Sequence, residues 1–211
     1  QTKLRASAYR RWKESILLLA EYLERYEDSA ERLEARYLLA RSLQAAAKEA
    51  QQRLSDSLPA NARAELFREI SRQLSEAISQ YGLLQRDLQL LRNEGQLDAY
   101  GQELYRVSYL EVPNALFAQE MYPEALTGYQ TLRNRFSDHV TVLTAYVQMA
   151  RCYDQMQDPG NALRQLEQAR VILSRLPDEA FQTASTGMSR EEWSQWIDWA
   201  RQLHTNRRNT T

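Results

Sequence analysis

The chain has 211 residues, enough for one domain or a small pair. Leu, Ala, Arg, Glu and Lys make up almost half of it, whereas it contains only 6 glycines and 5 prolines. So few turn-forming residues exclude β and α/β folds, and they predict an all-α protein. The 27 basic and 28 acidic residues nearly cancel and are interspersed, which excludes the basic surface of a nucleic-acid-binding protein.

The residues also argue against a membrane span and against catalysis. The longest stretch without a charged residue, from His139 to Ala150, is well short of the roughly 20 residues that cross a bilayer. The two histidines lie far apart in the sequence, and neither has the spacing of a metal ligand set. Cys152 is the single cysteine, and no phosphate-binding glycine loop or nucleophile motif is present. We therefore expect a protein without enzymatic activity, metal or cofactor.

The first 57 residues are expected to form a helical pair. A polar break at Asp28 separates a first helix from a second one over about residues 29–54, and Asp28 is the expected N-cap of that second helix, with Glu31 completing a capping box. Because the sequence begins at Gln1, we expect a processed chain or a segment of a longer one.

Residues 58–103 are expected to continue this pair as a long hairpin. The spacing of apolar residues alternates between three and four positions, which is typical of the narrow seam of a coiled coil; they are Ile70, Leu74, Ala77, Tyr81, Leu84, Leu88 and Leu91. The pattern predicts a helix over residues 61–93, about 50 Å long, and the break at residues 55–59 lets the chain reverse. Such a hairpin either bridges its neighbours or projects as an arm that holds a partner.

Residues 104–177 contain a partial copy of the beginning of the chain. An offset of 110 aligns residues 13–43 with 123–153, and 7 of these 31 positions are identical. Asp138 matches Asp28 and is likewise expected to cap the next helix. Ala35 and Ala40 match Ala145 and Ala150, small residues that let a neighbouring helix approach closely. Each copy therefore predicts a helix, a capped turn and a second helix.

The second copy resembles a tetratricopeptide repeat (TPR). The residues that carry the resemblance are large, small and aromatic side chains at the spacing of that motif: Tyr146, Ala150, Tyr153, Ala162, Leu166 and Ala169, preceded by Tyr122, Ala125, Tyr129 and Leu132. The sequence departs from the motif at Pro113, which stands at a small-residue position and should start or kink its helix. The resemblance covers residues 112–176 well and 13–43 loosely. The loose part is similar to repeats of bacterial cell-envelope proteins, which slightly favours the envelope or periplasm over the cytoplasm.

The resemblance to that family implies an α-solenoid that binds a peptide or protein partner in a groove. The positions of this sequence that match the groove-facing places of the repeat are Asn114, Phe117, Thr144, Val147, Arg151, Asp154 and Gln155, and Arg41 aligns with Arg151. An arginine in a groove can form bidentate pairs with a carboxylate. The alternative, that Arg41 and Arg151 form ion pairs with neighbouring helices, stays open.

Residues 178–211 are expected to form a loop, a last helix and a frayed tail. Ser189 and Glu192 have the spacing of a capping box, and the helix carries Trp193, Trp196, Ile197, Ala200 and Leu203 on one face. This helix is expected to cap the open end of the repeats. Two functions remain open at this point: a scaffold that binds a partner in its groove, or a structural subunit of a larger assembly or homo-oligomer that uses the hairpin and the tryptophan-rich helix as contacts.

Overall fold

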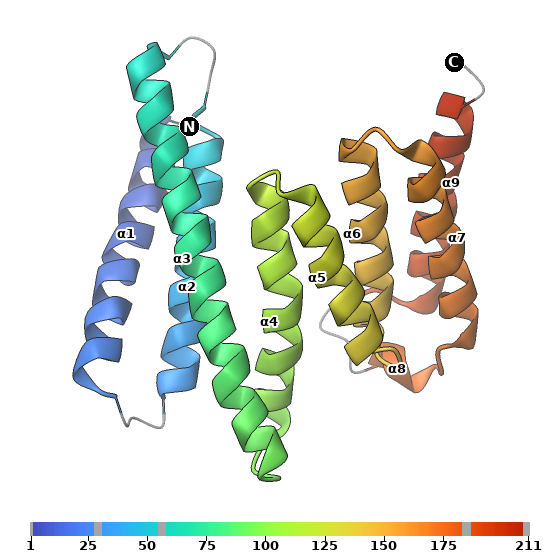
Figure 1. The fold of residues 1–211 in the computed structure, drawn as a ribbon, viewed down its shortest axis with the longest axis horizontal. Coiled ribbons are helices and arrows are strands. Elements are labelled where there is room, and N and C mark those ends of the chain that lie inside the picture. Colours follow the sequence, from blue (N-terminus) through green and yellow to red (C-terminus); the bar gives the residue numbers. More distant parts are fainter. Residues whose placement is uncertain (1, 28–30, 55–57, 183–186, 209–211) are drawn as a thin grey trace. The chain divides into compact units, whose positions relative to one another are not determined.

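The computed structural model describes residues 2–27, 31–54, 58–182 and 187–208, and over these residues it contains nine helices and no strand. The all-α prediction is confirmed. The chain divides into two compact units, residues 1–119 and 120–211. Within each unit the long helices follow one another as antiparallel neighbours (Figure 1).

Unit 1 contains α1 (Thr2–Arg25), α2 (Arg32–Gln51), α3 (Ala60–Asn93) and α4 (Ala99–Ala118). The long helix predicted over residues 61–93 is confirmed as α3, which packs on both α2 and α4. Six of its seven seam residues are buried, from Ile70 to Leu88, and Leu91 is half-buried. The seam is therefore an internal core of unit 1, with α2 and α4 packed against it.

The end of α3 shows how the sequence reverses the chain. Gly95 has a φ of 71°, a left-handed conformation that glycine adopts without steric cost. Its amide donates to the Arg92 carbonyl, and the Gln96 amide donates to the Leu91 carbonyl, the two bonds of a Schellman motif. The Asp98 carboxylate then accepts a 2.7 Å hydrogen bond from the Gly101 amide and so caps α4.

Unit 2 contains α5 (Tyr122–Arg135), α6 (Thr141–Gln155), α7 (Pro159–Arg175), the short α8 (Glu179–Gln182) and α9 (Arg190–Arg208). Helix α6 packs on α5 and α7, and α7 also packs on α9. Ala150, Ala162, Leu166 and Ala200 form one buried cluster, which joins three of the TPR-like positions to the last helix.

The capping box at the start of α9 is confirmed. The Ser189 amide donates a 2.7 Å hydrogen bond to the Glu192 carboxylate, and the Glu192 amide donates to the Ser189 hydroxyl at 3.2 Å. Trp193 and Ile197 are buried, so the predicted apolar face does pack on the preceding helices. Leu203, on the same face, is 42% exposed.

One local prediction is wrong, and of the two effects predicted for Pro113, a helix start or a kink, the first is wrong and the second stays a prediction. Asp138 does not cap α6, because the chain makes a further turn and the helix begins only at Thr141; the His139 imidazole accepts the Thr141 amide instead, at 3.2 Å. Pro113 does not start a helix but lies buried inside α4, where the bond that residue 113 would donate to the Tyr109 carbonyl cannot form. Asp28 lies outside the described residues, and Glu31, at the N-cap position of α2, makes no side-chain capping bond.

Candidate functional site

Two surfaces bring together side chains that could bind a partner, and the first is a polar row on α6. Thr144, Gln148, Arg151 and Gln155 follow one another at steps of four, three and four residues, and we call this row the α6 face. Arg151 and Gln155 are exposed, whereas Thr144 and Gln148 are half-buried. The Arg151 guanidinium donates a 2.9 Å hydrogen bond to Gln148 Oε1, which orients it along the row.

The groove residues expected from the sequence have different environments. In unit 2, Val147 is 9% exposed and belongs to the core, and Asp154 is half-buried at the border of the α6 face. In unit 1, Asn114 and Phe117 are half-buried on α4. Arg41 is exposed on α2, where its guanidinium lies 5.5 Å from the centroid of the Tyr37 ring. Each group is positioned within its own unit.

The second surface is a cleft of about 500 Å³ in unit 1, which we call the Tyr9 cleft. It lies where α1, the chain after α2 and the first turns of α3 come together. Its lining residues are Tyr9, Lys13, Arg53, Leu58, Ala62, Glu65, Leu66 and Glu69. Its volume falls within the range of ligand pockets in proteins.

Two cations share the aromatic ring of the Tyr9 cleft. The Lys13 ammonium lies 4.9 Å from the Tyr9 ring centroid and the Arg53 guanidinium 5.1 Å from it, within the range of cation–π attraction. The ring also packs against the buried cluster around Ile70 and Leu74, so the core of unit 1 fixes its position. The fold thereby holds two positive charges beside one ring of the cleft lining.

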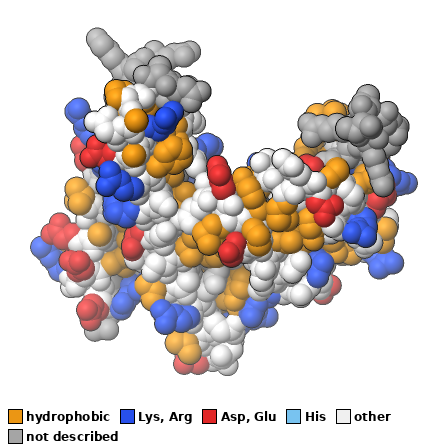
Figure 2. All heavy atoms as spheres, turned by 45° about the horizontal axis from the view of Figure 1, so that its top comes forward, with side chains coloured by type: hydrophobic (Ala, Val, Ile, Leu, Met, Phe, Trp, Pro, Cys, Tyr) orange, Lys and Arg blue, Asp and Glu red, His pale blue; other side chains and the backbone are white. Residues whose placement is uncertain are grey.

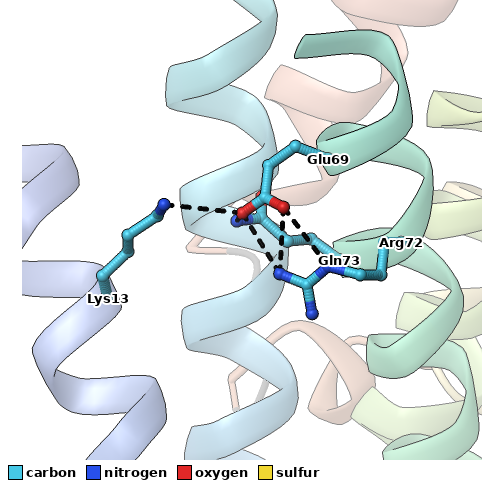
Figure 3. Close-up of polar contacts among 4 residues, drawn as sticks. All are labelled: Lys13, Glu69, Arg72 and Gln73. Carbon is cyan, nitrogen blue, oxygen red and sulfur yellow. Dashed lines mark hydrogen bonds and ion pairs between the residues drawn. The ribbon is translucent and has the colours of Figure 1, made fainter. Parts of the chain in front are cut away.

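Glu69 also lines the cleft and is held by several donors (Figure 3). Arg72, one turn further along α3, donates to both of its carboxylate oxygens at 3.0 to 3.2 Å. The Gln73 amide donates at 2.8 Å, and the Lys13 ammonium reaches across from α1 to 3.7 Å. Glu69 is therefore neutralised mainly from its own helix.

Gln73 is the buried support of this arrangement. It is 1% exposed, and its Oε1 has no hydrogen-bond partner among the described residues. Turning the amide over would bring Oε1 against the Glu69 carboxylate, two acceptors facing each other, so the observed orientation is the favourable one. Gln73 thus fixes the position of the Glu69 carboxylate.

The groups that could carry other chemistry lie elsewhere. Cys152 is fully buried in α6, and burial raises the pKa of its thiol to about 11, so it is protonated at neutral pH and contributes packing. Within the described ranges, no group of three or more His, Cys, Asp or Glu side chains could hold a metal ion. None of the helices described combines the length and the apolar character needed to cross a bilayer.

Sequence reasoning missed Gln148 and the whole Tyr9 cleft. Tyr9 and Lys13 stand four residues apart, which places them on one face of a helix. Their relationship to Arg53 and Glu69, however, depends on how α1 packs against α2 and α3, and no local pattern in the sequence encodes that packing.

On the face of the molecule drawn in Figure 2, basic, acidic and hydrophobic side chains are interspersed over both units.

Comparison with known proteins adds no identity, because no family model matches this chain and no curated protein matches it.

Proposed function

We propose that this chain is a non-enzymatic helical-repeat scaffold, a solenoid of TPR-like hairpins, which binds a peptide or protein partner on the α6 face. The observation that carries the proposal is the packing of α6. Its neighbours α5 and α7 bury most of the helix, yet a continuous polar row, the α6 face, stays at the surface. In the repeats that the sequence resembles, the first helix of each pair presents such a row to the ligand.

Arg151 is the residue of this row best suited to recognise a charged group. Its guanidinium is exposed and already oriented by Gln148, so less side-chain entropy is lost when it pairs with a carboxylate. A bidentate pair with an aspartate, a glutamate or a peptide C-terminus would fix the register of a bound segment.

The structure supplies a matched control for this residue. Arg164, on α7 of the same unit, is also exposed, and it also donates to an amide oxygen three residues earlier, that of Asn161. Charge reversal at the two positions changes the net charge of unit 2 equally. The two variants therefore differ in the helix that carries the change.

The test uses the full chain as bait for a pull-down from its native source, with Arg151→Glu and Arg164→Glu beside the wild type. We expect specific partners to be retained by the wild type and by Arg164→Glu but lost from Arg151→Glu, with circular dichroism unchanged in all three. Equal retention by all three baits would contradict a role of the α6 face. Separating the same extracts into cytoplasm and cell envelope, and detecting the chain in each fraction, tests the cell envelope as its compartment.

A second function, that of a subunit in a larger assembly, is favoured by one observation on α9. Trp199 is 57% exposed and Leu203 is 42% exposed, and the four-residue spacing places them on neighbouring turns. The seam of α3, by contrast, is buried within unit 1. Trp199→Glu is expected to dissociate an oligomer of this kind, and the mass in solution measures it; a wild-type monomer at all concentrations would exclude a homo-oligomer.

A further inference from the structure

We propose that the Tyr9 cleft is a second binding site of the scaffold, and that it takes a partner peptide segment in which a carboxylate stands next to an aliphatic side chain. The inference rests on the proposed function, because it specifies the chemistry of a bound protein partner. It concerns residues of unit 1 only and does not involve the α6 face.

The first step is the charge of the cleft. Among the described residues, no carboxylate forms an ion pair with Arg53, which is held over the Tyr9 ring by cation–π attraction. Among the described carboxylates, Lys13 pairs with that of Glu69, at 3.7 Å, and Arg72 already neutralises this group at shorter distance. The charged lining residues are Lys13, Arg53, Glu65 and Glu69, so cations and carboxylates are equal in number. Because Arg72, outside the lining, already pairs with Glu69 at 3.0 Å, the Arg53 guanidinium is the group of the lining best placed to take a further carboxylate.

The second step is preorganisation. Two cations that flank one aromatic ring repel each other, and the ring offsets only part of that repulsion. A carboxylate paired with Arg53 would reduce it, without displacing any hydrogen bond of Glu69. The ring is fixed by the core of unit 1, so both cations are already held at 4.9 and 5.1 Å from its centroid before a ligand arrives.

The third step is the apolar side of the cleft. Leu58, Ala62 and Leu66 line it and are only half-buried, so each leaves apolar surface that an aliphatic side chain could cover. The remaining lining charge, Glu65, is exposed at the first turns of α3 and would repel a second carboxylate placed there. The cleft therefore fits one acidic residue next to a Leu, Ile or Val, in preference to a run of acidic residues.

The experiment selects random seven-residue peptides, displayed on phage, on the immobilised full chain. We expect the wild type to enrich peptides in which Asp or Glu adjoins an aliphatic residue. Arg53→Glu is expected to abolish this enrichment and to favour Lys or Arg in its place. Arg68→Glu is the matched control, because Arg68 is exposed on α3, outside the cleft, and it changes the net charge equally; it should select as the wild type does.

One enriched peptide is then synthesised, and its affinity for each purified variant is measured by fluorescence anisotropy. Arg53→Glu should weaken binding at least tenfold, whereas Arg68→Glu should change it less than twofold. Because Arg53 is exposed, both variants are expected to keep the helix content of the wild type by circular dichroism.

The outcomes separate this inference from the proposed function. If the enrichment of acidic peptides is lost in Arg151→Glu but kept in Arg53→Glu, the cleft site is overturned and the scaffold function still stands. If no peptide is enriched at all, both proposals are overturned. Asp56 is the carboxylate nearest to Arg53 in sequence, and Asp56→Asn should select as the wild type does. If acidic peptides are enriched on Asp56→Asn and not on the wild type, the carboxylate that the cleft takes is the chain's own Asp56. That result would overturn the partner site.

Discussion

The Tyr81 hydroxyl of α3 donates a 2.8 Å hydrogen bond to Gln44 Oε1 of α2, in the interior of unit 1. The Gln44 amide in turn donates to the Glu111 carbonyl and carboxylate of α4, at 3.3 and 3.2 Å. Tyr81 is fully buried, and burial is the main cause that raises the pKa of its phenol. One polar chain therefore links three helices of unit 1.

Tyr81→Phe is expected to lower the free energy of unfolding of unit 1 by about 1 to 2 kcal/mol, because it leaves the amide oxygen of the half-buried Gln44 without its donor. Urea unfolding followed by circular dichroism measures the change. In a double-mutant cycle, Gln44→Leu should lower the free energy of unfolding less in the Tyr81→Phe background than in the wild type. In that background it removes an amide oxygen that has already lost its donor. Additive losses would show that the two side chains are not coupled.

Leu166→Asp is expected to destabilise unit 2 by about 3 kcal/mol or more, because it places a carboxylate in the cluster of Ala150, Ala162 and Ala200. Leu166 is 1% exposed. Gln168→Asp introduces the same side chain at an exposed position of α7 and should stay within about 0.5 kcal/mol of the wild type. Equal melting temperatures for the two variants would contradict the observed packing of α7.

Gln157→Gly is expected to stabilise unit 2 by about 1 kcal/mol. Gln157 has a φ of 59° directly after α6, where its amide and that of Asp158 form the two bonds of a Schellman motif. A residue with a Cβ is strained in this left-handed conformation, and glycine is not. Gln168→Gly, inside α7, should instead destabilise by about 1 kcal/mol. Chemical denaturation of both variants tests the opposite signs.

Acid should weaken unit 2 through the carboxylates that cap its helices. Bonds from the side-chain and backbone amides of Asn161 hold the pKa of Asp158 below 3.8, and bonds from Ser189 hold the pKa of Glu192 below 4.5. Because these folded-state values lie below the unfolded ones, the stabilisation is present above the unfolded pKa and is lost as the pH falls through the folded pKa. Glu192→Gln should therefore flatten the fall in urea midpoint below about pH 4.5. An unchanged pH profile would contradict this cap.

How far the sequence predicts this molecule depends on whether a feature is local. The three-and-four spacing from Ile70 to Leu88 is a property of one helix, so the limits of α3 and its buried face could be predicted. The capping box of Ser189 and Glu192 spans four residues and was equally visible. Asp138 was misassigned because the length of the turn before α6, and not the residue type, decides which side chain meets the first amide.

The links between helices could not be predicted in the same way. The partners of Tyr81 and Lys13 are 37 and 56 residues away in sequence, and helical periodicity places a side chain on a face without naming what covers that face. The α6 face was partly predicted, since Arg151 and Gln155 are at its surface, but Val147 is in the core. The Tyr9 cleft, built from three segments, became visible only in the structure.

Arg190 joins the end of α7 to the start of α9, and it carries the last prediction. Its guanidinium donates to the carbonyls of Leu173 and Leu176, where α7 ends, and to the Asp178 carboxylate at 2.8 Å. It also lies 4.7 Å from the Phe181 ring centroid. One side chain thus satisfies backbone acceptors that the end of a helix leaves without intrahelical partners.

Arg190→Ala is expected to destabilise unit 2 by about 2 to 3 kcal/mol, because several hydrogen bonds to a charged donor are lost together. Arg190→Lys should recover less than half of this loss, since an ammonium cannot reproduce the planar fork of the guanidinium. Arg175→Ala removes an exposed arginine from the last turn of α7 and serves as the control, with an expected change within about 0.5 kcal/mol. If thermal unfolding gave Arg190→Ala and Arg175→Ala the same midpoint, the connection between α7 and α9 would rest on apolar packing, such as that of Ala200 on Leu166, and not on Arg190.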